Sequence, residues 1–164
     1  MGIVIGVDLP EHPTSWAVVH GDDDSLWLGG LADAAAADAA AMRHDDHCLR
    51  EECAFVGAMT VPRYGAAFDA APTVQISTSN AVHLADLLGL GEDIWDLPAM
   101  DPDDLMGRVL LAQAIGPIDV GVPATATGQL IDCGRRPDWS QERLAEVHSV
   151  AMAAKQLGVL VVWA

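Results

Sequence analysis

Short apolar runs near the start of the chain alternate with turn-forming residues. The first run covers residues 3–8 and ends at a proline-rich turn, and the second covers residues 15–20 and is followed by a glycine and three aspartates. Runs of this length, rich in β-branched residues and separated by turn residues, are typical of strands. Together with residues 26–28, these runs predict an antiparallel meander of three short strands.

Longer stretches have the spacing and the end signals of helices. The alanine-rich stretch 31–52 favours a helix by composition, and residues 78–89 and 101–116 begin at capping residues and end at glycine. The last helix, 138–158, is expected to open with a capping box of Asp138 and Gln141 and to end at Gly158. Further strands are expected at residues 54–61, 74–76, 129–133 and 159–163, the last covered on both faces because it is wholly apolar.

This order of elements predicts an α/β (or α+β) fold class. We expect a single domain over residues 1–164, in which the N-terminal antiparallel meander is joined by αβ units packed on a mixed sheet. A chain of 164 residues is long enough to bury a sizeable core.

The charge of the chain narrows its expected partners. It has 24 Asp plus Glu against 8 Lys plus Arg, a net charge of −16. A surface this negative repels phosphate backbones, so we expect no direct nucleic acid binding. No apolar run approaches the roughly 20 residues that cross a bilayer, and residues 1–8 do not resemble a signal peptide. We therefore expect no membrane association and a cytoplasmic location, where Cys48, Cys53 and Cys133 would stay reduced.

Two strand-to-helix loops form the best candidate site. The first loop contains Ser77, Thr78, Ser79 and Asn80, and the second contains Cys133, Gly134, Arg135 and Arg136. If both strands run the same way, the loops share one sheet edge, where helix N-termini present free N–H groups to ligands. The hydroxyls, the amide and the arginine pair then suit a small anion such as a phosphate or carboxylate, with Cys133 as an outside candidate nucleophile. The alternative is that the first loop only caps a helix and the arginines pair with nearby aspartates.

A second cluster lies at the polar end of the first helix. His44, His47, Cys48 and Glu51 share one face of that helix, and pairs of them one turn apart could hold a transition metal. All four cannot reach one ion, because seven helical residues span roughly 10 Å. The alternative, which the absence of an established metal-binding spacing favours, is a solvated polar helix end.

Two resemblances to known proteins follow from short segments. Residues 3–8 read IVIGVD and residues 15–19 read SWAVV. This pair resembles the first hairpin of ribonuclease H-like nucleases and Holliday-junction resolvases, which implies that Asp8 binds catalytic magnesium. The later acidic positions of that family are not evident, since the strand at 74–76 leads into Ser77 and Thr78. Segments 79–90, 132–136, 141–144 and 161–164 resemble uncharacterised small acidic proteins of actinobacteria and their phages, a likeness that implies no activity.

These features predict an acidic accessory protein without catalytic activity, encoded by a phage or a high-GC bacterium. We expect it to bind a protein partner or a second copy of itself as a homo-oligomer, and to need no cofactor. One alternative is a protein or enzyme that binds an anionic small molecule with loops 77–80 and 133–136. The other is a metal-dependent nuclease of the ribonuclease H-like class, with Asp8 in its site.

Overall fold

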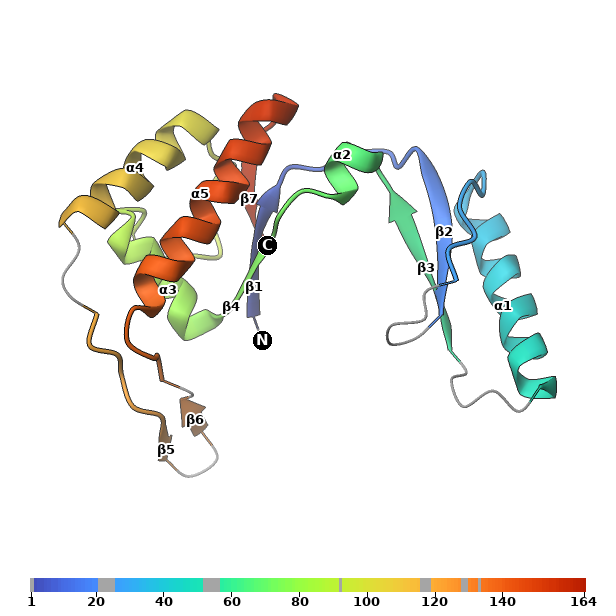
Figure 1. Ribbon diagram of the computed structural model, residues 1–164, viewed down its shortest axis with the longest axis horizontal. Helices are drawn as coiled ribbons and strands as arrows, with labels where there is room; N and C mark the ends of the chain where they lie inside the picture. The colour runs from blue at the N-terminus through green and yellow to red at the C-terminus, as the bar shows by residue number, and fades with distance from the viewer. Residues whose placement is uncertain are drawn as a thin grey trace. The chain divides into compact units, whose positions relative to one another are not determined.

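The computed structural model of the chain describes residues 2–20, 26–51, 57–91, 93–115, 119–127, 130–132 and 134–164 (Figure 1). Contacts within the chain divide it into two compact units. Unit 1 consists of Met1–Asp8 and Ala71–Ala164, and unit 2 is Leu9–Ala70. The chain therefore starts unit 1, builds the whole of unit 2, and then returns to complete unit 1.

Unit 1 is built on a three-stranded antiparallel sheet. Its central strand is β1 (Gly2–Val7), which pairs with β4 (Val74–Ser77) on one side and with β7 (Val161–Trp163) on the other. Side chains alternate across a strand, and Ile3, Ile5 and Val7 are all buried while Val4 is exposed. One face of the sheet thus carries the core of this unit.

Three helices lie on the same side of that sheet: α3 (Thr78–Leu87), α4 (Pro102–Ile115) and α5 (Trp139–Leu157) (Figure 1). Each helix contributes fully buried side chains, among them Leu84, Leu105 and Leu144. A short antiparallel ribbon of β5 (Thr125–Thr127) and β6 (Leu130–Asp132) precedes α5. The helices and the sheet face together enclose an apolar core.

Unit 2 is smaller and simpler. It contains an antiparallel ribbon of β2 (Ser15–His20) and β3 (Ala58–Arg63), the helix α1 (Ala34–Arg50) in contact with both strands, and one helical turn, α2 (Ala66–Asp69). A core cluster forms where Val18 meets Ala40 and Ala41, with Leu31 and Ala58 partly buried against it. Most of these side chains are small, so this cluster buries little apolar area.

The predicted fold class is confirmed as α+β, but the strand pairing differs from the expectation. All pairings of the described strands are antiparallel, whereas a mixed sheet was expected. The N-terminal meander is wrong, because β1 pairs with β4 and β7 instead of β2, and residues 26–28 are not a strand. The last strand lies at the sheet edge, with Leu160 39% exposed just before it. The single domain over 1–164 stays a prediction.

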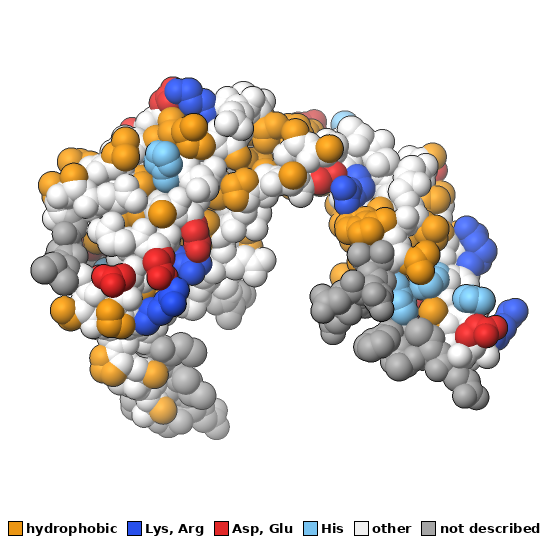
Figure 2. Space-filling model, viewed as in Figure 1, with side chains coloured by type: hydrophobic (Ala, Val, Ile, Leu, Met, Phe, Trp, Pro, Cys, Tyr) orange, Lys and Arg blue, Asp and Glu red, His pale blue; other side chains and the backbone are white. Residues whose placement is uncertain are grey.

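None of the described helices combines the length and the apolar character needed to cross a membrane. On the face shown in Figure 2, acidic side chains are dispersed, and several lie next to basic ones. The acidic side chains of the described residues are therefore spread over this face.

Candidate functional site

The two loops that the sequence singled out meet in unit 1. Arg135 lies between β6 and α5, and its Nη1 donates to the Asn80 side-chain oxygen at 3.4 Å. Asn80 belongs to the first turn of α3, and both side chains are half-buried. The hydrogen bond joins segments that are 55 positions apart in sequence, so these two residues of the loops lie close together. The expected shared sheet edge is wrong, because β4 and β6 belong to different sheets.

Two glycines allow the backbone around Arg135 to take its position. Arg135 and Val122 exchange two backbone hydrogen bonds of 2.7 Å each. Gly134 has φ +63°, and a Cβ there would lie 2.2 Å from the Val122 oxygen; Gly121 has φ +80°, and its Cβ would lie 2.7 Å from the Arg135 oxygen. Only glycine combines positive φ with such close approach at no steric cost. The Arg135 backbone is consequently fixed against the 119–122 segment.

Asp119 caps the helix that begins beside this segment. Its Oδ2 accepts from the Ser140 hydroxyl at 2.6 Å and from the Ser140 backbone N–H at 2.9 Å, while Oδ1 accepts from the Gly121 N–H at 3.0 Å. The predicted capping box at Asp138 is wrong. Asp138 has φ +62°, its side chain makes no capping hydrogen bond, and its own N–H donates to the Asp119 carbonyl. A residue distant in sequence has taken the capping role.

His83, on α3, is a further polar side chain near Asp119, Arg135 and Ser140. Its Nε2 lies 3.2 Å from the Ser140 Oγ. Burial lowers the pKa of His83, and the nearby Arg135 guanidinium lowers it further. The hydrogen bond from the Ser140 hydroxyl is the main cause that lowers the pKa of Asp119. Because Ser140 gives its proton to Asp119, the His83 Nε2 must donate to Ser140, so His83 is not positioned as a base toward this hydroxyl.

These groups line a cavity of about 190 Å³. One part of its wall is apolar and the other is polar. The lining residues are His83, Leu87, Ala112, Asp119, Val120, Gly121, Val122, Arg135, Ser140, Gln141 and Leu144. A cavity in which a few polar groups from distant segments converge, two of them with shifted pKa values, has the general character of a binding site.

No family model, curated protein or solved structure matches this chain. The cavity and its charges are therefore the basis on which a function is assigned.

The other residues of the predicted anion site do not line this cavity. Arg136 is exposed and pairs with Glu142. Ser77 and Ser79 are exposed, and their hydroxyls contact each other at 3.3 Å. Ser77 is the N-cap position of α3 and its side chain makes no capping hydrogen bond, while Thr78 begins the helix. The candidate nucleophile, Cys133, lies outside the described residues.

The weaker metal candidates separate in the structure. His44 and Cys48 lie together on α1 and are joined by His20 from the end of β2. His47 is exposed and is not part of this group. Asp8 is exposed after β1, and no group of three potential metal ligands in the described part of the chain includes it. His20 was not predicted as a candidate from the sequence. Trp16, Val18 and His20 occupy alternate positions of one strand and so share a face, and this spacing indicates that His20 points inward with Val18.

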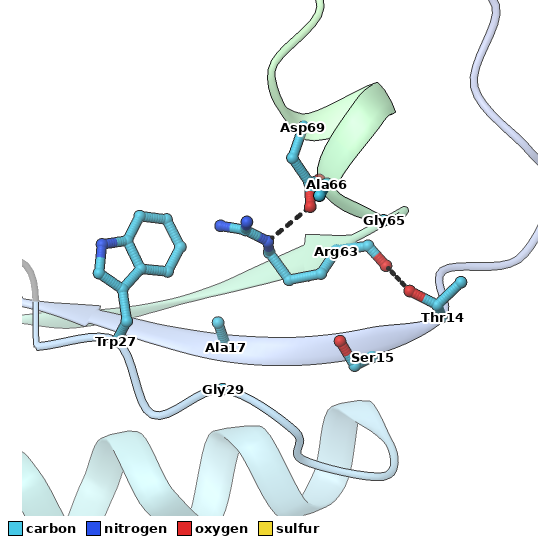
Figure 3. Close-up of a pocket in the computed structure, with 9 residues that line it drawn as sticks. All are labelled: Thr14, Ser15, Ala17, Trp27, Gly29, Arg63, Gly65, Ala66 and Asp69. Carbon is cyan, nitrogen blue, oxygen red and sulfur yellow. Dashed lines mark hydrogen bonds and ion pairs between the residues drawn. The ribbon is translucent and has the colours of Figure 1, made fainter. Parts of the chain in front are cut away.

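A second cavity, of about 520 Å³, lies in unit 2 (Figure 3). The Arg63 guanidinium lies 4.5 Å from the ring centroid of Trp27, and its Nε donates to Asp69 at 2.9 Å. The Thr14 hydroxyl donates to the Arg63 carbonyl at 2.9 Å. The arginine at this cavity is thus already paired with a carboxylate and stacked on an indole, unlike Arg135.

Proposed function

We propose that unit 1 binds a small carboxylate ligand in the 190 Å³ cavity, with Arg135 as its charge partner. The observation that carries this proposal is the state of Arg135. It has no carboxylate within ion-pair distance among the described residues, whereas Arg63, Arg108, Arg136 and Arg143 each have one. Arg43 and Arg50 have no such ion pair among the described residues either, but both are exposed, whereas Arg135 is half-buried. In a chain of net charge −16, a half-buried arginine bonded to a neutral amide has its bidentate face available for an anionic ligand.

The lining of the cavity favours a carboxylate with a short apolar chain over inorganic phosphate. Leu87, Ala112 and Leu144 form an apolar wall, whereas Arg135 and Ser140 contribute polar groups. A phosphate has no apolar atoms to pack against this wall, whereas the hydrocarbon chain of a carboxylate would contact it. The volume of 190 Å³ is below the roughly 300–1,000 Å³ of sites for drug-sized molecules, so a ligand of few atoms is expected.

The proton arrangement favours binding over acyl transfer. An activated serine needs a base that accepts its proton, and here that proton lies on a bond to a carboxylate whose pKa is lowered. Ser140 and Asp119 are therefore positioning groups that hold the start of α5. Because these two groups fix the start of α5, the part of the cavity wall that they form is in place before the ligand binds.

The test compares two arginine variants. Isothermal titration with butyrate and hexanoate, with butanol and inorganic phosphate as comparison ligands, is run on the wild type, Arg135→Gln and Arg136→Gln. We expect saturable carboxylate binding that falls about 10–100-fold in Arg135→Gln, the range for one lost charged hydrogen bond, and is unchanged in Arg136→Gln. Circular dichroism checks that both variants are folded. Equal binding by both variants, or binding of phosphate alone, contradicts the proposal.

A second candidate function is the expected accessory role, in which the protein self-associates. Leu111 and Ile115 lie one turn apart on α4, and they are 60% and 72% exposed. Residues four apart share a helix face, so these side chains form an apolar stripe outside the core. We propose a second copy of the chain as its partner. Light scattering after size exclusion should show a dimer that salt strengthens by screening the net negative charge, and the double variant Leu111→Ser, Ile115→Ser should be monomeric.

A further inference from the structure

We propose that unit 2 binds a Zn²⁺ ion through His20 Nε2, His44 Nε2 and Cys48 Sγ. One ligand atom from each of these three residues lies within 4.8 Å of the other two. Two of the side chains come from α1 and one from β2, and none of them lines the cavity in unit 1. The site is therefore separate from the proposed carboxylate site and stands or fails independently of it.

The two sulfur–nitrogen distances match tetrahedral zinc. The Cys48 Sγ lies 3.7 Å from the His20 Nε2 and 3.6 Å from the His44 Nε2. With Zn–S of about 2.3 Å and Zn–N of about 2.0–2.1 Å, two ligands at a tetrahedral angle are roughly 3.5–3.6 Å apart. The two imidazole rings meet edge to face, with centroids 4.6 Å apart and an interplanar angle of 87°. Both imidazoles thus have Nε2 within 3.7 Å of the same sulfur, a spacing that allows one ion to bind all three atoms.

The sequence and the fold place these ligands without strain. His44 and Cys48 are four residues apart, so they lie on one face of α1, one turn from each other. His20 is the last residue of β2, in register with Ala58 of β3. Asp45 accepts from the Ala58 N–H at 2.8 Å, which ties the ligand-bearing turn of α1 to the strand opposite His20. Asp45 is thus a positioning residue for the site.

Burial and donor chemistry both favour a transition metal. His20 is 7% exposed and Cys48 is 5% exposed, while His44 is half-buried. Figure 2 shows histidine side chains gathered at one end of this unit. Imidazole and thiolate are the preferred ligands of zinc, whereas magnesium and calcium prefer oxygen. Binding replaces the thiol proton by the metal, so one proton is released to solvent, and the fourth tetrahedral position takes water or another ligand.

The small core of unit 2 gives the metal a structural role. Among the described residues, the buried cluster of this unit consists of Val18, Ala40 and Ala41, none of which is large. Short folding units with little buried apolar surface commonly depend on a metal or on disulfides, and structural zinc contributes directly to folding. A zinc ion bridging α1 and β2 would cross-link the two elements that this core holds together.

The test uses the full chain with Zn²⁺ and with Co²⁺ as a spectroscopic probe. Native mass spectrometry should show one zinc per chain, and Co²⁺ should give a thiolate-to-metal charge-transfer band in the near ultraviolet. Cys48→Ser should abolish that band, and His44→Gln should weaken zinc binding at least about 100-fold, beyond the 10–100-fold typical of lost outer-shell partners. The matched control is His47→Gln, an exposed histidine on the same helix, which should bind zinc like the wild type.

Folding is checked by circular dichroism in each variant. Of the three proposed ligands, His44 is the only one that is half-buried, so its substitution should perturb the fold least. Zinc should also raise the melting temperature of the wild type and of His47→Gln, and a chelator should reverse the rise. The proposal is overturned if the folded wild type takes up no zinc at micromolar concentration. It is equally overturned if His44→Gln and His47→Gln bind zinc with the same affinity, or if the cobalt band survives unchanged in Cys48→Ser.

Discussion

Replacing Asp119 by alanine tests the capping role that the structure gives this residue. The substitution removes three hydrogen bonds, from the Ser140 N–H, the Ser140 hydroxyl and the Gly121 N–H. Loss of an N-cap side chain costs about 0.5–2 kcal/mol, and a hydrogen bond to a charged group contributes about 1.5–3 kcal/mol. Because Asp119 is half-buried, water replaces part of this loss, and we expect a net decrease of about 2 kcal/mol. For a chain of this size, that decrease lowers Tm by about 4–8 °C.

The assay is urea unfolding followed by tryptophan fluorescence, with Trp139 on α5 as the nearby probe. The matched control is Asp138→Gly, at the position where the sequence predicted the cap. Since Asp138 has φ +62° and no capping bond, its replacement by glycine should be neutral or stabilising by up to about 1 kcal/mol. A larger loss in Asp138→Gly than in Asp119→Ala would refute the reasoning.

The pH dependence of stability is a second test of the hydrogen bonds that Asp119 accepts. The folded state lowers the pKa of Asp119, so its stabilising contribution is complete above the unfolded pKa of about 3.9 and is lost as pH falls through the lower folded pKa. The stability difference between wild type and Asp119→Ala should therefore be constant from about pH 7 to pH 5 and shrink below about pH 4. A difference that grows on acidification would show that the carboxylate is not held by these donors.

Three further predictions concern separate contacts. Arg135→Gln should raise the pKa of His83, because the Arg135 guanidinium is the second cause that lowers it. An NMR titration of the imidazole measures this pKa, and an unchanged value would show that Arg135 does not lie beside His83. Gly134→Ala should destabilise by at least about 2 kcal/mol in urea, since it combines positive φ with a backbone clash, and a wild-type midpoint would contradict the fixed loop. Asp45→Asn should weaken zinc binding about 10-fold while keeping the cobalt–thiolate band, whereas loss of the band would make Asp45 more than a positioning residue.

Local patterns predicted most elements of the fold but few of their partners. The predicted helices at 31–52, 101–116 and 138–158 correspond to α1, α4 and α5, because spacing and end residues are local properties. Strand pairing depends on contacts between distant segments. Nothing local in residues 3–8 shows that β1 pairs with residues near 75 and 162 instead of the next strand along the chain.

In the candidate sites too, residues close in sequence were predicted together, and most residues brought together from distant segments were missed. The two loops were expected to meet at one sheet edge; Asn80 and Arg135 do contact each other, but β4 and β6 belong to different sheets, so the expected reason was wrong. Asp119 and His83 were missed, since one lies in an extended segment and the other inside a helix. The packing of α3 against α5 brings His83 to Ser140, and the backbone hydrogen bonds of the 119–122 segment to residues 135–138 bring Asp119 there. Likewise, helix spacing placed His44 and Cys48 together, but His20, the third residue of this group, comes from a strand that the helix contacts only in the folded unit.

The pairing of β1 with β4 also determines how the chain must fold. Contact between Ile5 and Val74 closes a loop of about 70 residues, which costs roughly 2.5 kcal/mol more entropy than a four-residue turn. Once unit 2 has formed, Ser15 and Arg63 are adjacent in its ribbon. The flexible chain between Ile5 and Val74 is then only about 20 residues long, and the entropic cost of closing the loop falls by roughly 1 kcal/mol. We therefore expect folding of unit 2 to speed assembly of the central sheet, and β1 can complete its pairing with β7 only after residues 161–163 have been synthesised.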